Sequence, residues 1–357
     1  MTSNRVTRSL FSHASPRRSP HEVLRRMLER IGPEVPAGGP DGPVAVVERR
    51  VAGLLGKEAG LLFPTGKMAQ QVALRVHAER RGRWTFAAHP HCHLVEWEAQ
   101  GFSVVHGLRF AAVADRHELI SLADLERVAE PLAAVLWELP QRDLGGLLPT
   151  WDELVAQTGL ARSRGAAAHM DGARLWEAQT YYDRPLADVA GLFDSVYVSL
   201  YKGLQGVAGS VLAGDADFVA HAAVWRLRLG GEIHAAWPLA ASALYGLDEL
   251  LPRMPEFRDH AVALAAAINA DGVAFTVPGV PLTPLFHVVL PASRAAVERA
   301  GAALAAEEGV QLFGAVRSSP DPGRCSFEVS VGESAVEFSP AELVGFIRGL
   351  LKRAGGS

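Results

Sequence analysis

Residues 166–174 read Ala-Ala-Ala-His-Met-Asp-Gly-Ala-Arg, and residues 195–203 read Ser-Val-Tyr-Val-Ser-Leu-Tyr-Lys-Gly. Each stretch opens with a short apolar run, so we expect buried strands at 166–170 and 195–200. Asp171 follows the first strand and Lys202 the second, with one helical crossover between them. Ligands bind at the carboxyl ends of strands in a parallel sheet. The two side chains are therefore candidates for one shared site.

Working outward, the same alternation of short apolar runs and helical patterns extends over most of the chain. Further strands are expected at 61–64, 83–88, 103–106 and 133–139. Strands that alternate with helices predict an α/β domain with a mostly parallel sheet, with limits near 36 and 250. Residues 251–357 predict a smaller α+β domain with helices near 261–267, 295–307 and 340–352, and residues 1–35 an N-terminal arm and helix.

Composition limits the class of protein. The chain has 357 residues, of which 49% are hydrophobic, which excludes a disordered chain. A formal net charge of −4 gives no basic excess for binding nucleic acid. The uncharged stretch 272–293 contains four prolines, so we expect no membrane span there. Two cysteines are too few for a disulfide framework and favour a cytoplasmic protein.

The first 21 residues contain several arginines and serines and no acidic residue. This composition is weakly typical of a transit peptide. A basic N-terminal arm is the interpretation that we favour.

Three strand ends together carry the parts of a cofactor site. Thr65, Gly66 and Lys67 follow the strand at 61–64 and begin a helix, which is a common cradle for an anion. Lys202 could form a Schiff base, and Asp171 could hold a cationic ring nitrogen. A phosphate cradle, a lysine and a carboxylate are what pyridoxal 5'-phosphate (PLP) requires. The alternative is a surface lysine and a helix-capping aspartate.

Several motifs in this order resemble those of PLP-dependent threonine aldolases. Gly56-Lys-Glu-Ala followed by Pro64-Thr-Gly resembles their GKEA…PTG segment, and residues 169–174 resemble their HxDGAR. Residues 202–204 with 209–210 resemble SKGL…GS, and Gly230-Gly231 matches the double glycine that follows. The resemblance spans roughly residues 40–240 and extends to the broader beta-eliminating lyase group. It implies the PLP-dependent transferase fold of type I, with a large domain built on a seven-stranded sheet.

The resemblance also implies roles for individual residues. It makes Lys202 the covalent attachment point of PLP, Asp171 the partner of the pyridine nitrogen, and His93 the imidazole stacked on the ring and the candidate base. It assigns the phosphate to Thr65, Gly66 and Lys67. Arg174 and Ser12 would hold the substrate carboxylate. The partner subunit would complete the site, so the resemblance implies a homodimer or homotetramer.

This chain departs from the family pattern at several positions. Lys67 stands where the family has Thr, and Tyr201 where it has Ser. His234 stands in place of an arginine that contacts the phosphate from a neighbouring subunit. Gln141 lies near the position of a family histidine, and Arg324 is the nearest candidate for a second arginine that binds the carboxylate.

The histidines of residues 89–93 suggest an alternative. His89, His91 and His93 alternate along an extended segment and would share one face, as zinc ligands could. No carboxylate or cysteine ligand is clearly placed beside them, and the resemblance already uses His93. We therefore expect no metal.

The favoured function is cleavage of a β-hydroxy-α-amino acid, threonine or a similar compound, to glycine and an aldehyde. Another PLP reaction on an amino acid, such as β-elimination, stays open, because the orientation of the substrate decides which bond breaks. A non-catalytic relative is a third hypothesis, against which the retained Lys202 and Asp171 argue.

Overall fold

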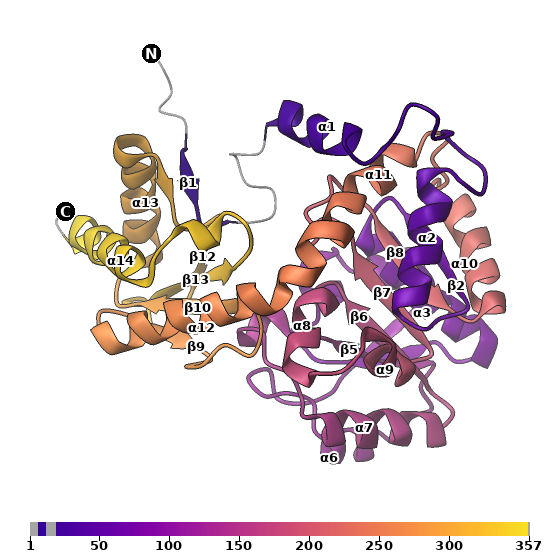
Figure 1. The fold of residues 1–357 in the computed structure, drawn as a ribbon. Helices are drawn as coiled ribbons and strands as arrows, with labels where there is room; N and C mark the ends of the chain where they lie inside the picture. The colour runs from indigo at the N-terminus through magenta and orange to yellow at the C-terminus, as the bar shows by residue number, and fades with distance from the viewer. Residues whose placement is uncertain (1–5, 12–18, 356–357) are drawn as a thin grey trace. The chain divides into compact units, whose positions relative to one another are not determined.

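The structure is a computed structural model that describes residues 6–11 and 19–355, and it divides into two compact units (Figure 1). One unit is residues 24–251. The other joins the described residues before Leu24 to the chain from Pro252 onward. The domain limits at residues 36 and 250 stay a prediction.

A seven-stranded sheet forms the centre of the unit 24–251. Its strands, in spatial order, are β2 (Ala59–Phe63), β8 (Ser210–Gly214), β7 (Ser195–Ser199), β6 (Ala167–Gly172), β5 (Ala134–Glu138), β3 (Thr85–Ala88) and β4 (Arg109–Ala112). The five strands from β7 to β4 are parallel, whereas β8 runs antiparallel to both of its neighbours. The expected mostly parallel sheet is confirmed.

Helices accompany this sheet. They are α2 (Pro43–Leu54), α3 (Gly66–Arg81), α4 (His93–Trp97), α5 (Gly101–Val104), α6 (Leu122–Glu126), α7 (Trp151–Ser163), α8 (Leu175–Tyr182), α9 (Leu186–Gly191), α10 (Ala216–Arg228) and α11 (Trp237–Tyr245). Helix α3 begins at Thr65, whose side chain accepts a hydrogen bond from the amide of Met68, and ends at Gly82 in the left-handed conformation. Its apolar face includes Val72 and Val76, which pack in one core cluster with residues of β2 and β7.

The strand predicted at residues 103–106 was wrong. These residues belong to α5 and the turn after it, and the next strand of the sheet is β4, which begins at Arg109. Val104 is 81% exposed and Val105 56% exposed, so neither β-branched side chain is buried as a strand of this sheet requires. Strand β8 was not predicted.

The other unit contains a four-stranded antiparallel sheet in the order β12 (Val316–Ser318), β13 (Cys325–Ser330), β10 (Leu285–Leu290) and β9 (Phe275–Val277). Its helices are α12 (Met254–Asp271), α13 (Arg294–Glu308) and α14 (Pro340–Gly355). Strand β1 (Arg8–Ser9) pairs in parallel with β11 (Val310–Gln311). Helix α1 (Pro20–Leu28) lies at the start of the chain.

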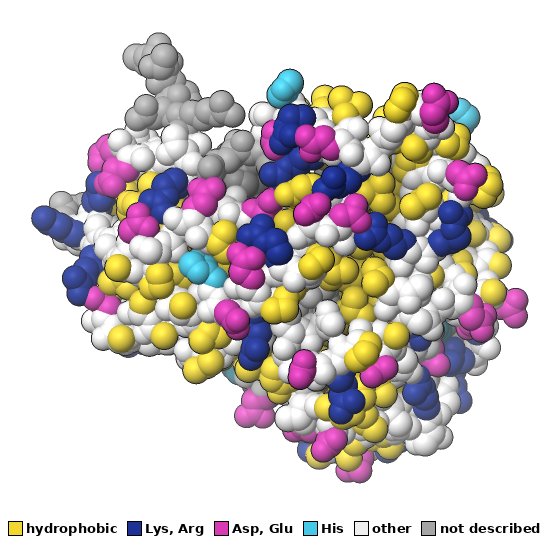
Figure 2. Space-filling model, viewed as in Figure 1, with side chains coloured by type: hydrophobic (Ala, Val, Ile, Leu, Met, Phe, Trp, Pro, Cys, Tyr) yellow, Lys and Arg dark blue, Asp and Glu magenta, His cyan; other side chains and the backbone are white. Residues whose placement is uncertain are grey.

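Charged side chains of both signs are interspersed over the visible face of the molecule (Figure 2). This mixture agrees with the small net charge of −4. Within the residues that the structure describes, no helix is long and apolar enough to span a membrane.

Candidate active site

A cavity of about 310 Å³ lies among the predicted site residues of the unit 24–251. Its walls come from the turn between β2 and α3, from the segment around α4, and from the segments that follow β6 and β7. The lining includes six predicted residues, Thr65, Gly66, Lys67, His93, Asp171 and Lys202, and also Gln70, Glu98, Tyr197 and Tyr201. Residues separated by more than 130 positions in the sequence thus meet because β2, β6 and β7 share the sheet.

The amino end of α3 forms one wall. The amides of Gly66 and Lys67 lie in the first turn, where backbone N–H groups have no partner within the helix. A Cβ atom at Gly66 would lie 2.0 Å from the hydroxyl of Tyr197, so only glycine fits beside that phenol. The ammonium group of Lys67 donates to the carbonyl of Trp97 at 3.0 Å. The wall therefore offers backbone donors that suit an anion.

Two carboxylates and one amine lie beside one another. Asp171 and Glu138 are register neighbours on β6 and β5, and Asp171 Oδ1 accepts from the amide of Ala173 at 3.0 Å. Burial raises the pKa of Asp171, and it raises the pKa of Glu138 to about 8. Burial, followed by the charge of Arg174, lowers the pKa of Lys202. The carboxylate of Asp171 would stabilise a cationic ring, and a lysine of lowered pKa suits nucleophilic attack.

His93 is oriented by an acidic residue that sequence reasoning did not select. The Nδ1 atom of His93 lies 2.9 Å from Glu98 Oε1, and Glu98 Oε2 accepts from Gln71 at 2.8 Å. The carboxylate of Glu98 accepts a hydrogen bond from Nδ1–H, so in the neutral ring Nε2 carries the lone pair that can accept a proton. The signals in the sequence were the Glu-Ala-x-Gly motif that Glu98 begins and its spacing of five positions from His93.

Arg174 and Gln141 are buried but are not among the residues that line the cavity. The Nη1 atom of Arg174 lies 3.7 Å from Glu177 Oε1. Gln141 donates to the carbonyl of His91 at 3.3 Å and lies 3.5 Å from Glu138 Oε2. Their roles toward a substrate stay predictions.

Three other predicted residues lie elsewhere or outside the description. His234 lines a second cavity of about 250 Å³, together with Glu48 and Arg226. Arg324 belongs to the other compact unit, where its half-exposed side chain lies 3.3 Å from Asp321. Ser12 lies outside the described residues.

The histidines considered for zinc have other partners. His89 Nε2 lies 2.9 Å from the carbonyl of Glu118, His91 Nδ1 lies 3.0 Å from Glu96 Oε1, and His93 is held by Glu98. Among the residues described, no three metal-ligating side chains come together in a suitable group.

Comparison with known proteins shows a relationship over nearly the whole chain. A protein of Listeria monocytogenes, provisionally classed as an L-allo-threonine aldolase, is 34% identical with a TM-score of 0.90, covering 98% of this chain and 97% of that one. A protein of Exiguobacterium, provisionally classed as an aromatic amino acid beta-eliminating lyase/threonine aldolase, is 33% identical with a TM-score of 0.89 and covers 98% of both chains.

A curated relative is also similar in sequence. The low specificity L-threonine aldolase of Escherichia coli is 31% identical over 263 residues, which cover 70% of this chain and 76% of the relative. The model of the beta-eliminating lyase family matches residues 24–286, which include every described residue that lines the cavity. The chain therefore belongs to the beta-eliminating lyase family and has the fold of its threonine aldolases.

Proposed function

We propose that this protein is a PLP-dependent lyase that cleaves threonine, or a similar β-hydroxy-α-amino acid, into glycine and an aldehyde. The observation that carries the proposal is the single cavity that Lys202, Asp171 and the amino end of α3 share. An amine, a carboxylate and an anion cradle match the aldehyde, the ring nitrogen and the phosphate of PLP. The relatives named as threonine aldolases support the choice of reaction.

The residues of the cavity would hold the cofactor by complementary charge. The amides of Gly66 and Lys67 would donate to the phosphate, and Lys202 Nζ would join the aldehyde carbon with loss of water. Asp171 would keep a proton on the ring nitrogen, because a buried carboxylate stabilises a cation beside it. When bound, PLP supplies the electron sink for the pair of electrons released from the broken Cα–Cβ bond.

His93 would act on the substrate as the base. Its Nε2 atom would take the proton of the β-hydroxyl group, while Glu98 would stabilise the resulting imidazolium through Nδ1. Loss of that proton turns the β-carbon into the carbonyl carbon of the aldehyde. The remaining two-carbon fragment gains a proton at its α-carbon and leaves as glycine.

The direct test is product formation. We expect the protein loaded with PLP to release acetaldehyde and glycine from threonine in equal amounts, as an alcohol dehydrogenase assay and amino acid analysis would measure. The matched control substrate is O-methylthreonine, which keeps the carbon skeleton but has no hydroxyl proton for His93 to remove. Release of ammonia and a keto acid from threonine, without glycine, would contradict aldol cleavage.

Arg174 is proposed as the residue that holds the substrate carboxylate. Its planar guanidinium can donate two parallel hydrogen bonds, which a lysine cannot reproduce. We expect Arg174→Lys to raise the KM for amino acid substrates, and Arg174→Ala to cost roughly 2–5 kcal/mol of binding free energy. The measurement is a glycine titration of the PLP-loaded proteins, followed by the absorption of the cofactor.

The same titration separates substrate binding from cofactor binding. Both Arg174 variants should still take up PLP, because the proposed cofactor contacts lie at other residues. Equal affinity for glycine in wild type and Arg174→Ala would contradict the role, and would redirect attention to Arg324 and the segment around Ser12.

We also propose a cytoplasmic homodimer or homotetramer. Cys92 and Cys325 are both free and buried, which suits a reducing compartment. Leu227 and Ile233 are exposed apolar side chains close in sequence to His234, as expected if a second copy covers this region. Sedimentation equilibrium would test the assembly, and a monomer at micromolar concentration would contradict it.

A further inference from the structure

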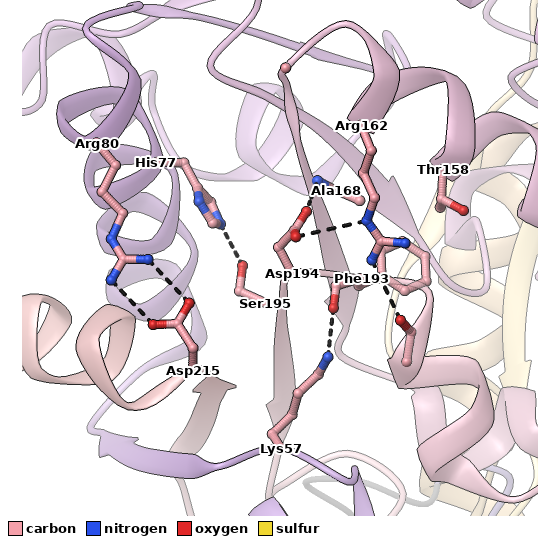
Figure 3. Close-up of polar contacts among 12 residues, drawn as sticks. Lys57, His77, Arg80, Thr158, Arg162, Ala168, Phe193, Asp194, Ser195 and Asp215 are labelled. Carbon is pink, nitrogen blue, oxygen red and sulfur yellow. Dashed lines mark hydrogen bonds and ion pairs between the residues drawn. The ribbon is translucent and has the colours of Figure 1, made fainter.

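A row of buried side chains connects the outer part of α3 with the cavity. From outside to inside the row consists of Arg81, His77, Ser195, His169 and Gln70. Arg81 Nη1 lies 3.3 Å from His77 Nδ1, and His77 Nε2 lies 2.7 Å from Ser195 Oγ. On the inner side, Ser195 Oγ lies 2.8 Å from His169 Nδ1, and His169 Nε2 lies 2.6 Å from Gln70 Oε1. Figure 3 shows His77 on α3 pointing toward Ser195 on β7.

The direction of the outer two hydrogen bonds follows from Arg81. Arg81 can only donate, so His77 Nδ1 accepts and His77 Nε2–H must donate to Ser195. Burial lowers the pKa of His77 far below its usual value and that of His169 to about 3, so each imidazole is neutral and carries one N–H.

The other end of the row gives the direction at His169. Its Nε2 lies 2.6 Å from Gln70 Oε1, which can only accept, so Nε2 carries the proton of His169. His169 Nδ1 then accepts from the hydroxyl of Ser195, which itself accepts from His77. The Nε2–H group of His169 donates to Gln70 Oε1, which fixes the amide of Gln70 in one of its two orientations. The Nε2 group of Gln70 must therefore face away from His169.

Gln70 is 1% exposed and lines the cavity, as Asp171 does. Its Nε2 atom is buried, and no described residue accepts a hydrogen bond from it. A buried donor without an acceptor is costly, so such a group in a cavity wall points to a ligand that supplies the acceptor.

We propose that Gln70 is a binding residue of the cavity whose Nε2 donates to an acceptor atom of PLP, and that His169, Ser195, His77 and Arg81 are positioning residues that fix its amide. The inference rests on the proposed function for the identity of the ligand. The orientation of the amide rests on the hydrogen bonds alone.

The first experiment changes Gln70 itself. Gln70→Met keeps an unbranched side chain of similar length and removes the donor. We expect it to weaken PLP binding by about tenfold or more, as measured by titration of the cofactor-free protein. Gln179→Met is the matched control, because Gln179 donates to the carbonyl of Arg184 and does not line the cavity. Unchanged PLP affinity in Gln70→Met would overturn the inference.

The second experiment acts at a distance. Ser195→Ala removes the hydroxyl that contacts His169 Nδ1. The backbone carbonyl of residue 195 lies 3.2 Å from His169 Nδ1 and stays available as an acceptor. We expect His169 to move its proton to Nδ1, and Gln70 to turn its amide and present Oε1 to the cavity. PLP affinity should then fall as in Gln70→Met. A Ser195→Ala protein that binds PLP like wild type would overturn the proposal.

The protonated nitrogen of His169 can be read directly from ¹⁵N spectra of the cofactor-free protein, assigned by loss of the signal in His169→Gln. We expect Nε2–H in wild type and Nδ1–H in Ser195→Ala. Ser199→Ala, on the same strand, should keep Nε2–H, because the hydroxyl of Ser199 donates to the carbonyl of Ala173 instead.

These measurements keep the two proposals apart. A wild-type protein that does not bind PLP would contradict the proposed function, whatever the state of His169. A wild-type protein that binds PLP but carries the His169 proton on Nδ1 would overturn the positioning role of the buried side chains, and would not contradict the proposed function.

Discussion

Lys202→Ala is expected to abolish covalent attachment of PLP and to reduce turnover by ~10³-fold or more, the scale of losing a catalytic group with no substitute. The amine of Lys202 interacts with the charges of Asp171 and Glu138, and burial lowers its pKa, which favours the neutral, nucleophilic form. Reduction of the PLP-loaded wild type with borohydride, followed by peptide mapping, should place the pyridoxyl group on Lys202.

The other lysines provide internal controls. Lys57 donates to the carbonyl of Phe193 at 2.6 Å, as Figure 3 shows, and Lys67 donates to the carbonyl of Trp97 at 3.0 Å. Lys57→Arg should therefore leave the label on Lys202 and the turnover close to that of wild type. A label on Lys57 or Lys67 in the wild-type protein would contradict the assignment.

The fold was predictable where local patterns coincide with burial. Strands β6 and β7 are completely buried, and both were expected from the apolar residues at 166–170 and 195–200. The prediction of a strand at 103–106 was wrong because Val104 and Val105 are exposed apolar residues, and a β-branched pair does not indicate burial by itself.

The candidate site was predictable where a residue lies at or just beyond the carboxyl end of a strand, as Asp171 does on β6 and Lys202 does after β7. Glu98 and Gln70 were missed, because what makes them important is a partner on another element. Glu98 matters through His93, and Gln70 through His169, which lies 99 positions away in the sequence. The contact of Gln70 with His169 forms only when the chain folds, and the five-residue spacing of His93 and Glu98 does not by itself indicate a contact.

Asp171→Asn is expected to leave covalent attachment at Lys202 intact and to slow turnover by ~10²-fold or more, as for loss of one preorganised electrostatic partner. Asparagine keeps the size of the side chain and can still accept from the amide of Ala173, which now bonds to Asp171 Oδ1 at 3.0 Å. What it loses is the negative charge that would hold a proton on the ring nitrogen. The measurement is the rate of aldehyde release at saturating threonine, with the absorption of bound PLP recorded in parallel.

Glu138→Gln is the matched comparison, because Glu138 is the register neighbour of Asp171 and undergoes the same change from carboxyl to amide. Glu138 does not line the cavity, so its variant should slow turnover far less than Asp171→Asn does. Burial and the charge of Asp171 raise the pKa of Glu138 to about 8, so its carboxyl group is mostly protonated near neutral pH and the amide introduced by Glu138→Gln is a close substitute. Near-normal turnover in Asp171→Asn, or an equal loss in both variants, would show that the charge of Asp171 does not act on a cationic ring.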